Sequence, residues 1–402
     1  MQPHLTSPVG RRQPGVGEVL VVFLRLGLSS FGGPIAHLGY FRRELVERRG
    51  WLSEAAYADL IGLCQFLPGP ASSQAGFAFG LMRAGPWGGL AAWAGFTLPS
   101  AVALAVLGVM VGGITGPIGA AAIHGLKLVA VPIVAQAVIG MARTLAPDLP
   151  RALMALAAAA LMLGTTAPAM QLVAIAGGAL AGLLLCRSQA AEARPPGGWI
   201  PSRRAGLLCL ALFAAALVPA LLLQGRAAHR LVAITADFYR AGALVFGGGH
   251  VVLPLLRASL VPRWIGDPAF LAGYGAAQAV PGPLFTFSAY VGAHVAGVPG
   301  AAVALIAIFA PGLLLVAAAL PFHGRIRESA RAQRALAGVN AAVVGILAAA
   351  LYDPLWITAI ASPIDVAIAL AGLAALWRWR VPPLAVVLGT VAASLAAAVA
   401  TP

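Results

Sequence analysis

Two arginines inside apolar segments are the clearest chemical signal in the sequence. Arg25 and Arg240 each stand six residues before a Phe-Gly-Gly motif. An ionisable side chain at membrane depth is costly, so a functional role is the default hypothesis. Two guanidinium groups facing one centre would offset the charge of a dianion. In the alternative interpretation, each arginine extends to a membrane surface or pairs with Glu18, Asp237 or a carbonyl oxygen.

Helix-breaking motifs accompany these arginines. Pro68-Gly69-Pro70 recurs 213 positions later as Pro281-Gly282-Pro283, in both cases three residues after a glutamine, Gln65 or Gln278. Proline has no amide hydrogen and glycine accepts unusual backbone angles, so a helix must break at both places. We expect the two glutamines to bond backbone groups that the breaks release. A second pair of breaks is predicted at Phe31-Gly32-Gly33-Pro34 and Phe246-Gly247-Gly248.

A helix that restarts after a break offers free N–H groups and the positive end of its dipole to an anion. Ser72 and Ser73 follow the first Pro-Gly-Pro motif and are placed to cap the next helix. The sequence therefore predicts substrate-binding groups in both halves of the chain. Besides the arginines, they are Gly32, Gly33, Gly69, Ser72, Ser73, Gly247, Gly248 and Gly282.

The chain is built from two homologous halves. The offset of 213 carries four further residues onto like residues: His37 to His250, Trp51 to Trp264, Pro86 to Pro299 and Gly125 to Gly338. Upstream of the histidines the offset is 215, and a two-residue gap explains the change. The sequence thus predicts that one structural unit occurs twice.

Other polar residues at matching positions of the two halves are weaker candidates for contact with the substrate. Lys127, the only lysine, matches Asn340, and this pair is a candidate anion contact or proton-coupled group. A lysine that packs near the membrane surface is an equally good interpretation. For His37 and His250 we favour a hydrogen bond to a loose backbone carbonyl at a hairpin bend over contact with substrate.

Composition places the chain in a membrane. Of its 402 residues 60% are hydrophobic and 9% are charged, with a mean hydropathy of +0.91. Several apolar runs reach the roughly 20 residues that a spanning helix needs, so an all-α polytopic membrane protein is expected. We divide it into a cytoplasmic tail (1–16), a first repeat (17–186), a cytoplasmic linker (187–204), a connecting transmembrane helix (205–224) and a second repeat (225–402).

Basic residues predict the orientation. The net charge of +14 is dispersed between apolar spans, which favours a lipid bilayer over nucleic acid as the partner. Loop 111–122 has no Lys or Arg, whereas its counterpart 323–334 has four arginines. Because cytoplasmic loops are enriched in these residues, the two halves are expected to be inverted, with the N-terminus in the cytoplasm and the C-terminus in the periplasm.

Several function classes find no support. The sequence has no Walker A, HExxH or GxSxG motif, so no enzyme is indicated. The three cysteines have no CxxC spacing, and no metal site is expected. With only 12 acidic residues, a carboxylate-lined path for metal cations is poorly supported. We expect no cofactor.

The motifs in combination resemble the chromate ion transporter family, whose long members have two homologous halves. The matching motifs are Phe31 to His37, Trp51-Leu52 and Gln65 to Pro70, with Phe246 to His250 and Gln278 to Pro283 in the second half. The resemblance covers all but residues 1–16 and 187–204.

This resemblance implies secondary active export of chromate across a bacterial inner membrane, driven by the membrane potential or ion exchange, with chromate resistance as the result. Sulfate is an isosteric tetrahedral dianion, so a sulfate or other oxyanion transporter stays open, as does an anion channel. The expected partners are the anion, the bilayer and, as an open alternative, a second copy of the chain in a homodimer.

The inverted arrangement predicts opposite accessibility of two loops. A cysteine introduced at Gly116 should react with an impermeant thiol reagent added outside, whereas one at Ser329 should not, because the two positions are expected on opposite sides. Labelling of intact cells and of inverted vesicles measures this. Equal labelling of both cysteines from one side would mean that the halves run parallel.

Overall fold

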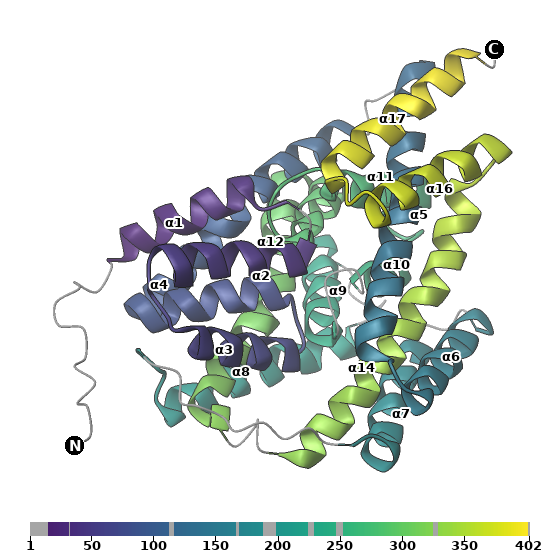
Figure 1. Cartoon of the computed structure of the whole chain (residues 1–402). Coiled ribbons are helices and arrows are strands. Elements are labelled where there is room, and N and C mark those ends of the chain that lie inside the picture. Colours follow the sequence, from purple (N-terminus) through teal and green to yellow (C-terminus); the bar gives the residue numbers. More distant parts are fainter. Residues whose placement is uncertain are drawn as a thin grey trace.

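The computed structural model describes residues 15–31, 33–111, 116–165, 169–187, 198–223, 229–246, 252–324 and 329–400. Within these ranges every regular element is a helix and there is no strand (Figure 1). Five helical stretches are long and apolar enough to cross a bilayer, and four shorter helices are also apolar. The expected all-α, multi-pass membrane fold is thereby confirmed.

Each half of the chain consists of a series of helices. The first half contains α1 (Val16–Ser29), α2 (Gly33–Phe41), the π-helical η1 (Arg42–Arg48), α3 (Glu54–Phe66), α4 (Ala71–Met110), α5 (Gly116–Leu145), α6 (Leu149–Leu163) and α7 (Ala169–Leu185). Helix α8 (Arg203–Leu222) joins the halves. The second half contains α9 (Arg230–Leu244), α10 (Val252–Leu260), α11 (Asp267–Ala277), η4 (Leu284–Thr286), α12 (Phe287–Ala319), η5 (Leu320–Phe322), α14 (Ala330–Ala350), η6 (Leu351–Trp356), α15 (Ile357–Ala359), α16 (Pro363–Trp377) and α17 (Pro383–Ala400).

The breaks at the Pro-Gly-Pro motifs form as predicted. Helix α3 begins after Ser53, whose hydroxyl accepts a bond from the Ala56 amide, and ends at Phe66. Leu67 is extended, as expected for a residue directly before a proline. Helix α4 then starts directly after Pro70. In the second half α11 ends at Ala277, and η4 starts directly after Pro283.

Helices α4 and α12 fold back on themselves. Gly80 and Gly88 would lie about 12 Å apart along a straight helix, yet a Cβ on Gly80 would be 2.2 Å from the Gly88 carbonyl oxygen. The turn is at Ala84 and Gly85, and the equivalent turn of α12 is at Ala296 and Gly297. Each long helix is therefore a hairpin, whose second arm is long enough to cross a bilayer.

This turn corrects one predicted equivalence. The backbone angles of Ala84 and Gly85 are nearly those of Ala296 and Gly297, which makes the local offset 212. Pro86 therefore corresponds to Val298, and its expected match with Pro299 is wrong by one residue. The second half has one residue fewer between its break and its turn, where the tighter 3-10 turn η4 replaces the α-helical start of α4.

In each half, one long helix is covered by two helices of the other half. Helix α5 is covered by α16 and α17, and the equivalent α14 is covered by α6 and α7 (Figure 1). Gly125 of α5 lies against Val391 of α17, and Gly338 of α14 lies against Gly178 of α7. The offset of 213 relates the two contacts. Helices α4 and α12 also pack together, and α1 on α4 is matched by α9 on α12.

One contact departs from this reciprocal pattern. Helix α11 packs on α5, where a Cβ on Gly275 would lie 1.9 Å from the Leu126 carbonyl oxygen. The equivalent helix α3 has its main contacts with α4 and η1 instead. The short helix before the Pro-Gly-Pro break therefore packs differently in the two halves, against α5 in the second half and against α4 and η1 in the first.

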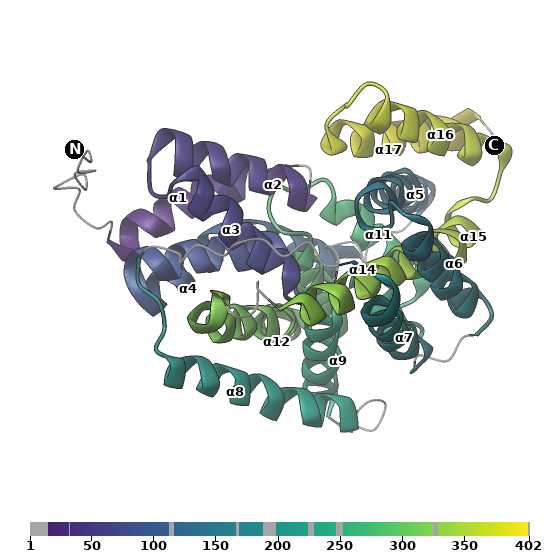
Figure 2. The same ribbon diagram turned by 60° about the horizontal axis from the view of Figure 1, so that its bottom comes forward.

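The outer helices present apolar side chains. Helix α8 lies along one edge of the molecule and the α16–α17 pair along the opposite edge (Figure 2). Leu208 and Leu222 of α8 are 60% and 64% exposed, and Val102 of α4 is 61% exposed. Because water would disfavour so much exposed hydrocarbon, lipid is the solvent that fits this surface.

The contact between α7 and α14 can be tested with two adjacent glycines. Gly178→Leu should destabilise the protein by about 1 to 3 kcal/mol because its side chain would enter α14 at Gly338. Gly177→Leu is the matched control, since a Cβ there would meet nothing within 4 Å. Thermal unfolding in detergent should show a lower melting temperature for Gly178→Leu alone; equal melting temperatures would contradict the close packing.

Candidate anion-binding site

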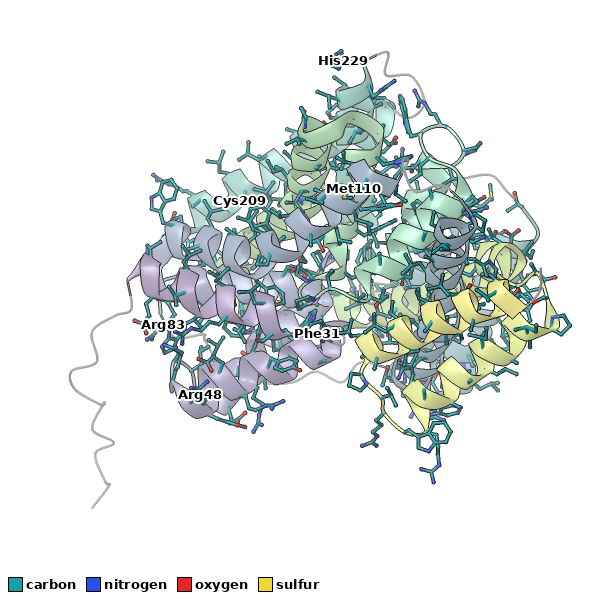
Figure 3. The ribbon with its side chains drawn as sticks, turned by 90° about the horizontal axis from the view of Figure 1, so that it is seen from above. Phe31, Arg48, Arg83, Met110, Cys209 and His229 are labelled. Carbon is teal, nitrogen blue, oxygen red and sulfur yellow. The ribbon has the colours of Figure 1, made fainter. Side chains whose placement is uncertain are left out.

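The helix breaks of the two halves meet at the centre of the protein. The Gly69 amide donates to the Val245 carbonyl oxygen over 2.7 Å, and the Gly282 amide donates to the Ser30 carbonyl oxygen over 2.9 Å. Val245 ends α9 before Phe246, and Ser30 ends α1 before Phe31. Each Pro-Gly-Pro break is therefore bonded to the Phe-Gly-Gly end of the opposite half. Figure 3 places Phe31 towards the middle of the molecule, away from Arg48 and Arg83.

Gly69 and Gly282, the two central glycines, occupy positions where a side chain would not fit. Gly69 has φ +125 and Gly282 has φ +106, angles that other residues rarely adopt. A Cβ on Gly69 would lie 2.9 Å from Gln74 Nε2, and one on Gly282 would lie 2.7 Å from Ser100 Oγ. The backbone at the two breaks can thus approach a neighbouring helix closely.

The serines after the first break do not cap α4, which corrects the prediction. The N-cap residue is Pro70, and no side chain caps the helix. Ser72 and Ser73 lie inside the first turn and are 2% and 1% exposed. Ser72 Oγ is 3.4 Å from His37 Nδ1, while Ser73 Oγ has no hydrogen-bond partner among the described residues. Proline already supplies the extended residue before the helix, so the hydroxyls point elsewhere.

Gln74 takes the role that the sequence suggested for Gln65. Its Nε2 donates to the Pro68 carbonyl oxygen over 2.8 Å and to the Gly312 carbonyl oxygen over 3.2 Å. Gln65 is exposed. Gln278 of the second half has a buried Nε2 without a partner among the described residues. The signal that could have identified Gln74 is its position four residues after Pro70, on the first turn of the restarted helix.

The two arginines lie in different surroundings. Arg240 is 6% exposed, and its Nη2 bonds to Asp237 Oδ1 over 3.2 Å and to Ser259 Oγ. Its Nη1 is buried without a partner in the described part of the chain. Arg25 lies on the exposed side of α1. The pairing with Asp237 that the sequence left open is therefore present for Arg240, which keeps one free donor nitrogen.

Lys127 and Asn340 are both half-buried, on α5 and α14. Leu126, the residue before Lys127, contacts Gly275 of α11. Lys127 therefore lies near the helix that precedes the second Pro-Gly-Pro break. Asn340 Oδ1 is buried without a partner among the described residues. One turn before Lys127, His124 Nε2 is 2.7 Å from Asp365 Oδ1 of α16.

Some predicted residues lie outside the described part of the chain. These are Gly32, Gly247, Gly248 and His250, and the Pro34 side chain also lies outside it. Gly33 begins α2 with φ +78, and Phe31 and Phe246 are half-buried. Pro70 and Pro283 are buried, whereas Pro68 and Pro281 are half-buried. In the described ranges no three His, Cys, Asp or Glu side chains form a metal-binding group.

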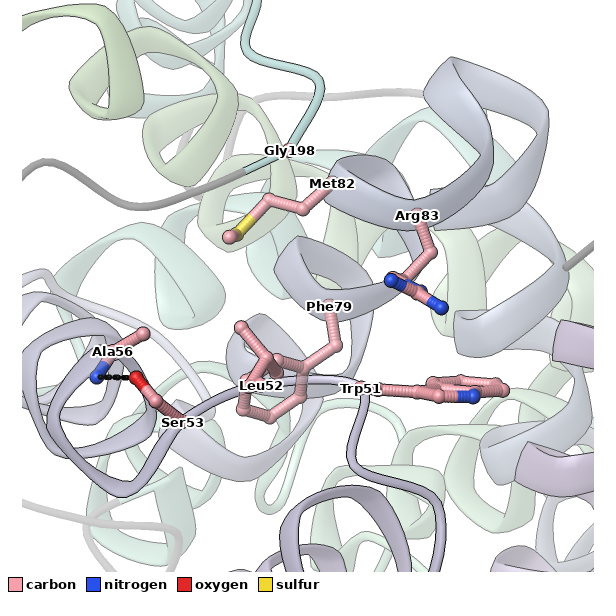
Figure 4. A pocket seen from close by; sticks show the side chains of 8 residues that line it. All are labelled: Trp51, Leu52, Ser53, Ala56, Phe79, Met82, Arg83 and Gly198. Carbon is pink, nitrogen blue, oxygen red and sulfur yellow. Dashed lines mark hydrogen bonds between the residues drawn. The ribbon is translucent and has the colours of Figure 1, made fainter. Parts of the chain in front are cut away.

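A pocket of about 360 Å³ lies away from the breaks, between α3, α4 and Gly198 (Figure 4). Arg83 lies over the Trp51 ring at 5.3 Å on its border. The equivalent Trp264 also has an arginine over its ring, Arg263 at 4.7 Å, but this arginine is its neighbour in the chain and is not the equivalent of Arg83. An arginine stacked on an indole is a stabilising surface contact. We assign no substrate to this pocket, because none of its lining residues belongs to a break.

A helical membrane protein whose two homologous halves join their helix breaks at a common centre has the architecture of a secondary transporter. The family model described as chromate transporter matches residues 17–183 and 232–395, so the chain belongs to this family of membrane transporters.

Relatives of known name agree with the family match. The chain is 32% identical over 339 residues to a probable chromate transport protein of Synechococcus elongatus, covering 82% of each chain. It is 31% identical over 384 residues to a chromate transport protein of Pseudomonas aeruginosa, covering 90% of this chain and 87% of the relative. A chromate transport protein of Cupriavidus metallidurans is 28% identical over 342 residues, covering 83% and 81%. No solved structure matches the chain.

The geometry predicts that both central glycines are essential. Gly69→Leu and Gly282→Leu should each abolish transport while the protein still inserts, because each side chain would separate a break from its neighbouring helix. Gly39→Leu is the control, since Gly39 is exposed and a Cβ there meets nothing within 4 Å. Anion uptake into vesicles, normalised to the amount of inserted protein, measures the effect. Near-normal uptake by either central variant would show that its break does not line the path.

Proposed function

We propose that this protein exports chromate from the cytoplasm across a bacterial inner membrane as a secondary active transporter and thereby confers chromate resistance. The observation that carries the proposal is the reciprocal bonding of Gly69 to Val245 and of Gly282 to Ser30. It joins the two Pro-Gly-Pro breaks to the ends of α1 and α9, where the first turn of α4 presents backbone N–H groups to an oxyanion. The family supplies chromate as the anion.

The charged residues have a supporting role in this proposal. Arg25, Arg240 and Lys127 give the path a positive potential, which attracts a dianion and raises its local concentration. Arg240 contributes through the Nη1 nitrogen that Asp237 and Ser259 leave free. The chain belongs in the membrane with its N-terminus in the cytoplasm and its C-terminus in the periplasm, following the arginine distribution.

The different packing of the equivalent helices α3 and α11 supports transport by alternating access. Helix α11 is packed on α5, while the equivalent α3 is packed mainly on α4 and η1. In a transporter made of two repeats, an exchange of these two arrangements opens the centre first to one side of the membrane and then to the other.

Transport into inverted vesicles tests the proposed function. Labelled chromate should accumulate against its gradient when a membrane potential or a proton gradient is imposed, and it should not do so in vesicles without the protein. Labelled sulfate in the same vesicles separates a chromate exporter from a sulfate or general oxyanion transporter. Equilibration without accumulation under every gradient would instead identify an anion channel.

Arginine variants test the contribution of charge. Arg25→Gln and Arg240→Gln should each lower chromate affinity by about 1 to 3 kcal/mol, or roughly five- to 150-fold, because one attractive group is lost. Lysine should restore only part of the affinity, since it keeps the charge but lacks the planar pair of donors. Affinity is measured in vesicles at fixed membrane potential.

Arg240 needs a further control because its loss leaves Asp237 buried and unpaired. The double variant Arg240→Gln/Asp237→Asn removes both charges and should restore expression without restoring affinity. Wild-type affinity in Arg25→Gln and in the double variant would assign both arginines a structural role.

A further inference from the structure

Three buried polar atoms near the second Pro-Gly-Pro break have no hydrogen-bond partner among the described residues. They are Ser30 Oγ, Thr97 Oγ1 and His37 Nε2. Ser30 and Thr97 are 0% exposed and His37 is 1% exposed. Buried polar side chains are nearly always paired, and each exception in a native structure needs a physical reason. All three residues belong to the first half; in the second half, Gln278 Nε2 and Ser288 Oγ are also buried without a partner among the described residues.

Direct contacts join these residues into one cluster. Gly282 bonds to the Ser30 carbonyl oxygen, and its Cα faces Ser100 Oγ and the Phe96 carbonyl oxygen of α4. Ser100 Oγ donates to the Thr97 carbonyl oxygen over 3.1 Å, which places both side chains on one stretch of α4. His37 meets the Phe96 ring edge-on at 5.2 Å and reaches Ser72 on the first turn after the break. We call Ser30, His37, Ser72, Thr97 and Ser100 the hydroxyl cluster.

The four hydroxyl residues of the cluster have apolar equivalents in the second half, while the equivalent of His37 is His250, which lies outside the described residues. The offsets that relate the halves carry Ser30 to Val245, Ser72 to Phe285, Thr97 to Phe309 and Ser100 to Gly312. The ring centroids of Phe285 and Phe309 lie 5.8 Å apart, so these two rings pack together where the first half has hydroxyl groups. Gln74 Nε2 lies against Gly312 there, and it is already bonded to the Pro68 and Gly312 carbonyl oxygens. The backbone is thus pseudo-symmetric at the centre, while the side chains are not.

We infer that the transported dianion binds on one side of the pseudo-symmetric centre, in the hydroxyl cluster of the first half, and that the phenylalanine side has no anion site. The inference rests on the proposed function and deepens it by naming the ligands. A fully ionised tetrahedral oxyanion accepts hydrogen bonds at every oxygen. The Ser30 and Thr97 hydroxyls can donate to it, and donors to a charged acceptor form the stronger class of hydrogen bond.

Thr97 gives the sharpest test because valine has nearly the same shape. Thr97→Val removes a hydroxyl that has no partner among the described residues, so the melting temperature of the anion-free protein should stay the same or rise. Chromate affinity should fall roughly tenfold or more, because a bond to a charged acceptor is lost. Ser30→Ala should behave in the same way. Both quantities come from one measurement, the rise in melting temperature of the detergent-solubilised full chain with increasing chromate or sulfate.

Thr390→Val is the matched control. Thr390 is 4% exposed on α17, and its hydroxyl donates to the Val386 carbonyl oxygen of its own helix. This variant should keep wild-type chromate affinity, which shows that removing a buried hydroxyl elsewhere does not affect binding.

The outcomes separate the inference from the proposed function. Wild-type chromate affinity in both Thr97→Val and Ser30→Ala would overturn the hydroxyl cluster as the site and leave the transporter assignment intact. A lower melting temperature of anion-free Thr97→Val would mean that its hydroxyl has a structural partner, which also overturns the inference. A wild-type protein that neither transports nor is stabilised by chromate or sulfate would overturn both.

Discussion

Two backbone hydrogen bonds, from Gly69 to Val245 and from Gly282 to Ser30, connect the halves at their centre. A carbonyl group at the end of a broken helix has lost its partner, and an unpaired group costs several kcal/mol where water is absent. Here the amide of the opposite Pro-Gly-Pro break satisfies it. Each half therefore supplies the amide that pairs with a broken helix end of the other half. The remaining packing is reciprocal as well, with α5 covered by α16 and α17 and α14 covered by α6 and α7.

The side chains at this centre do not share the symmetry of the backbone. Proline and glycine recur in both halves because the breaks need them. In contrast, Ser30, Thr97 and Ser100 of the first half correspond to Val245, Phe309 and Gly312 of the second. An unpaired buried hydroxyl is a cost unless a ligand bonds to it. On the proposed function, one half supplies donors and the other supplies tightly packed rings that exclude water, and lower water content strengthens the bonds to the anion.

Much of the fold could be predicted from residue chemistry alone. The breaks beside Gly69 and Gly282 follow from proline and glycine, and the apolar composition predicts a fold made of membrane helices. The predictions that were wrong concerned details of packing. Ser72 and Ser73 lie inside α4 because Pro70 already occupies the N-cap position. Pro86 does not match Pro299, because the 3-10 turn η4 shortens the second half by one residue.

The sequence by itself determined the membrane class, the two repeats, the breaks and the likeness to chromate transporters, because these depend on composition and on the local properties of proline, glycine and apolar side chains. Only the tertiary structure decided which carbonyl groups the broken helices bond to, that Gln74 rather than Gln65 serves the first break, and that Arg240 pairs with Asp237. It also decided that Ser30, His37 and Thr97 come together beside Gly282. These outcomes depend on contacts between residues far apart in the chain, and neither the spacing nor the type of those residues specifies which of them will meet.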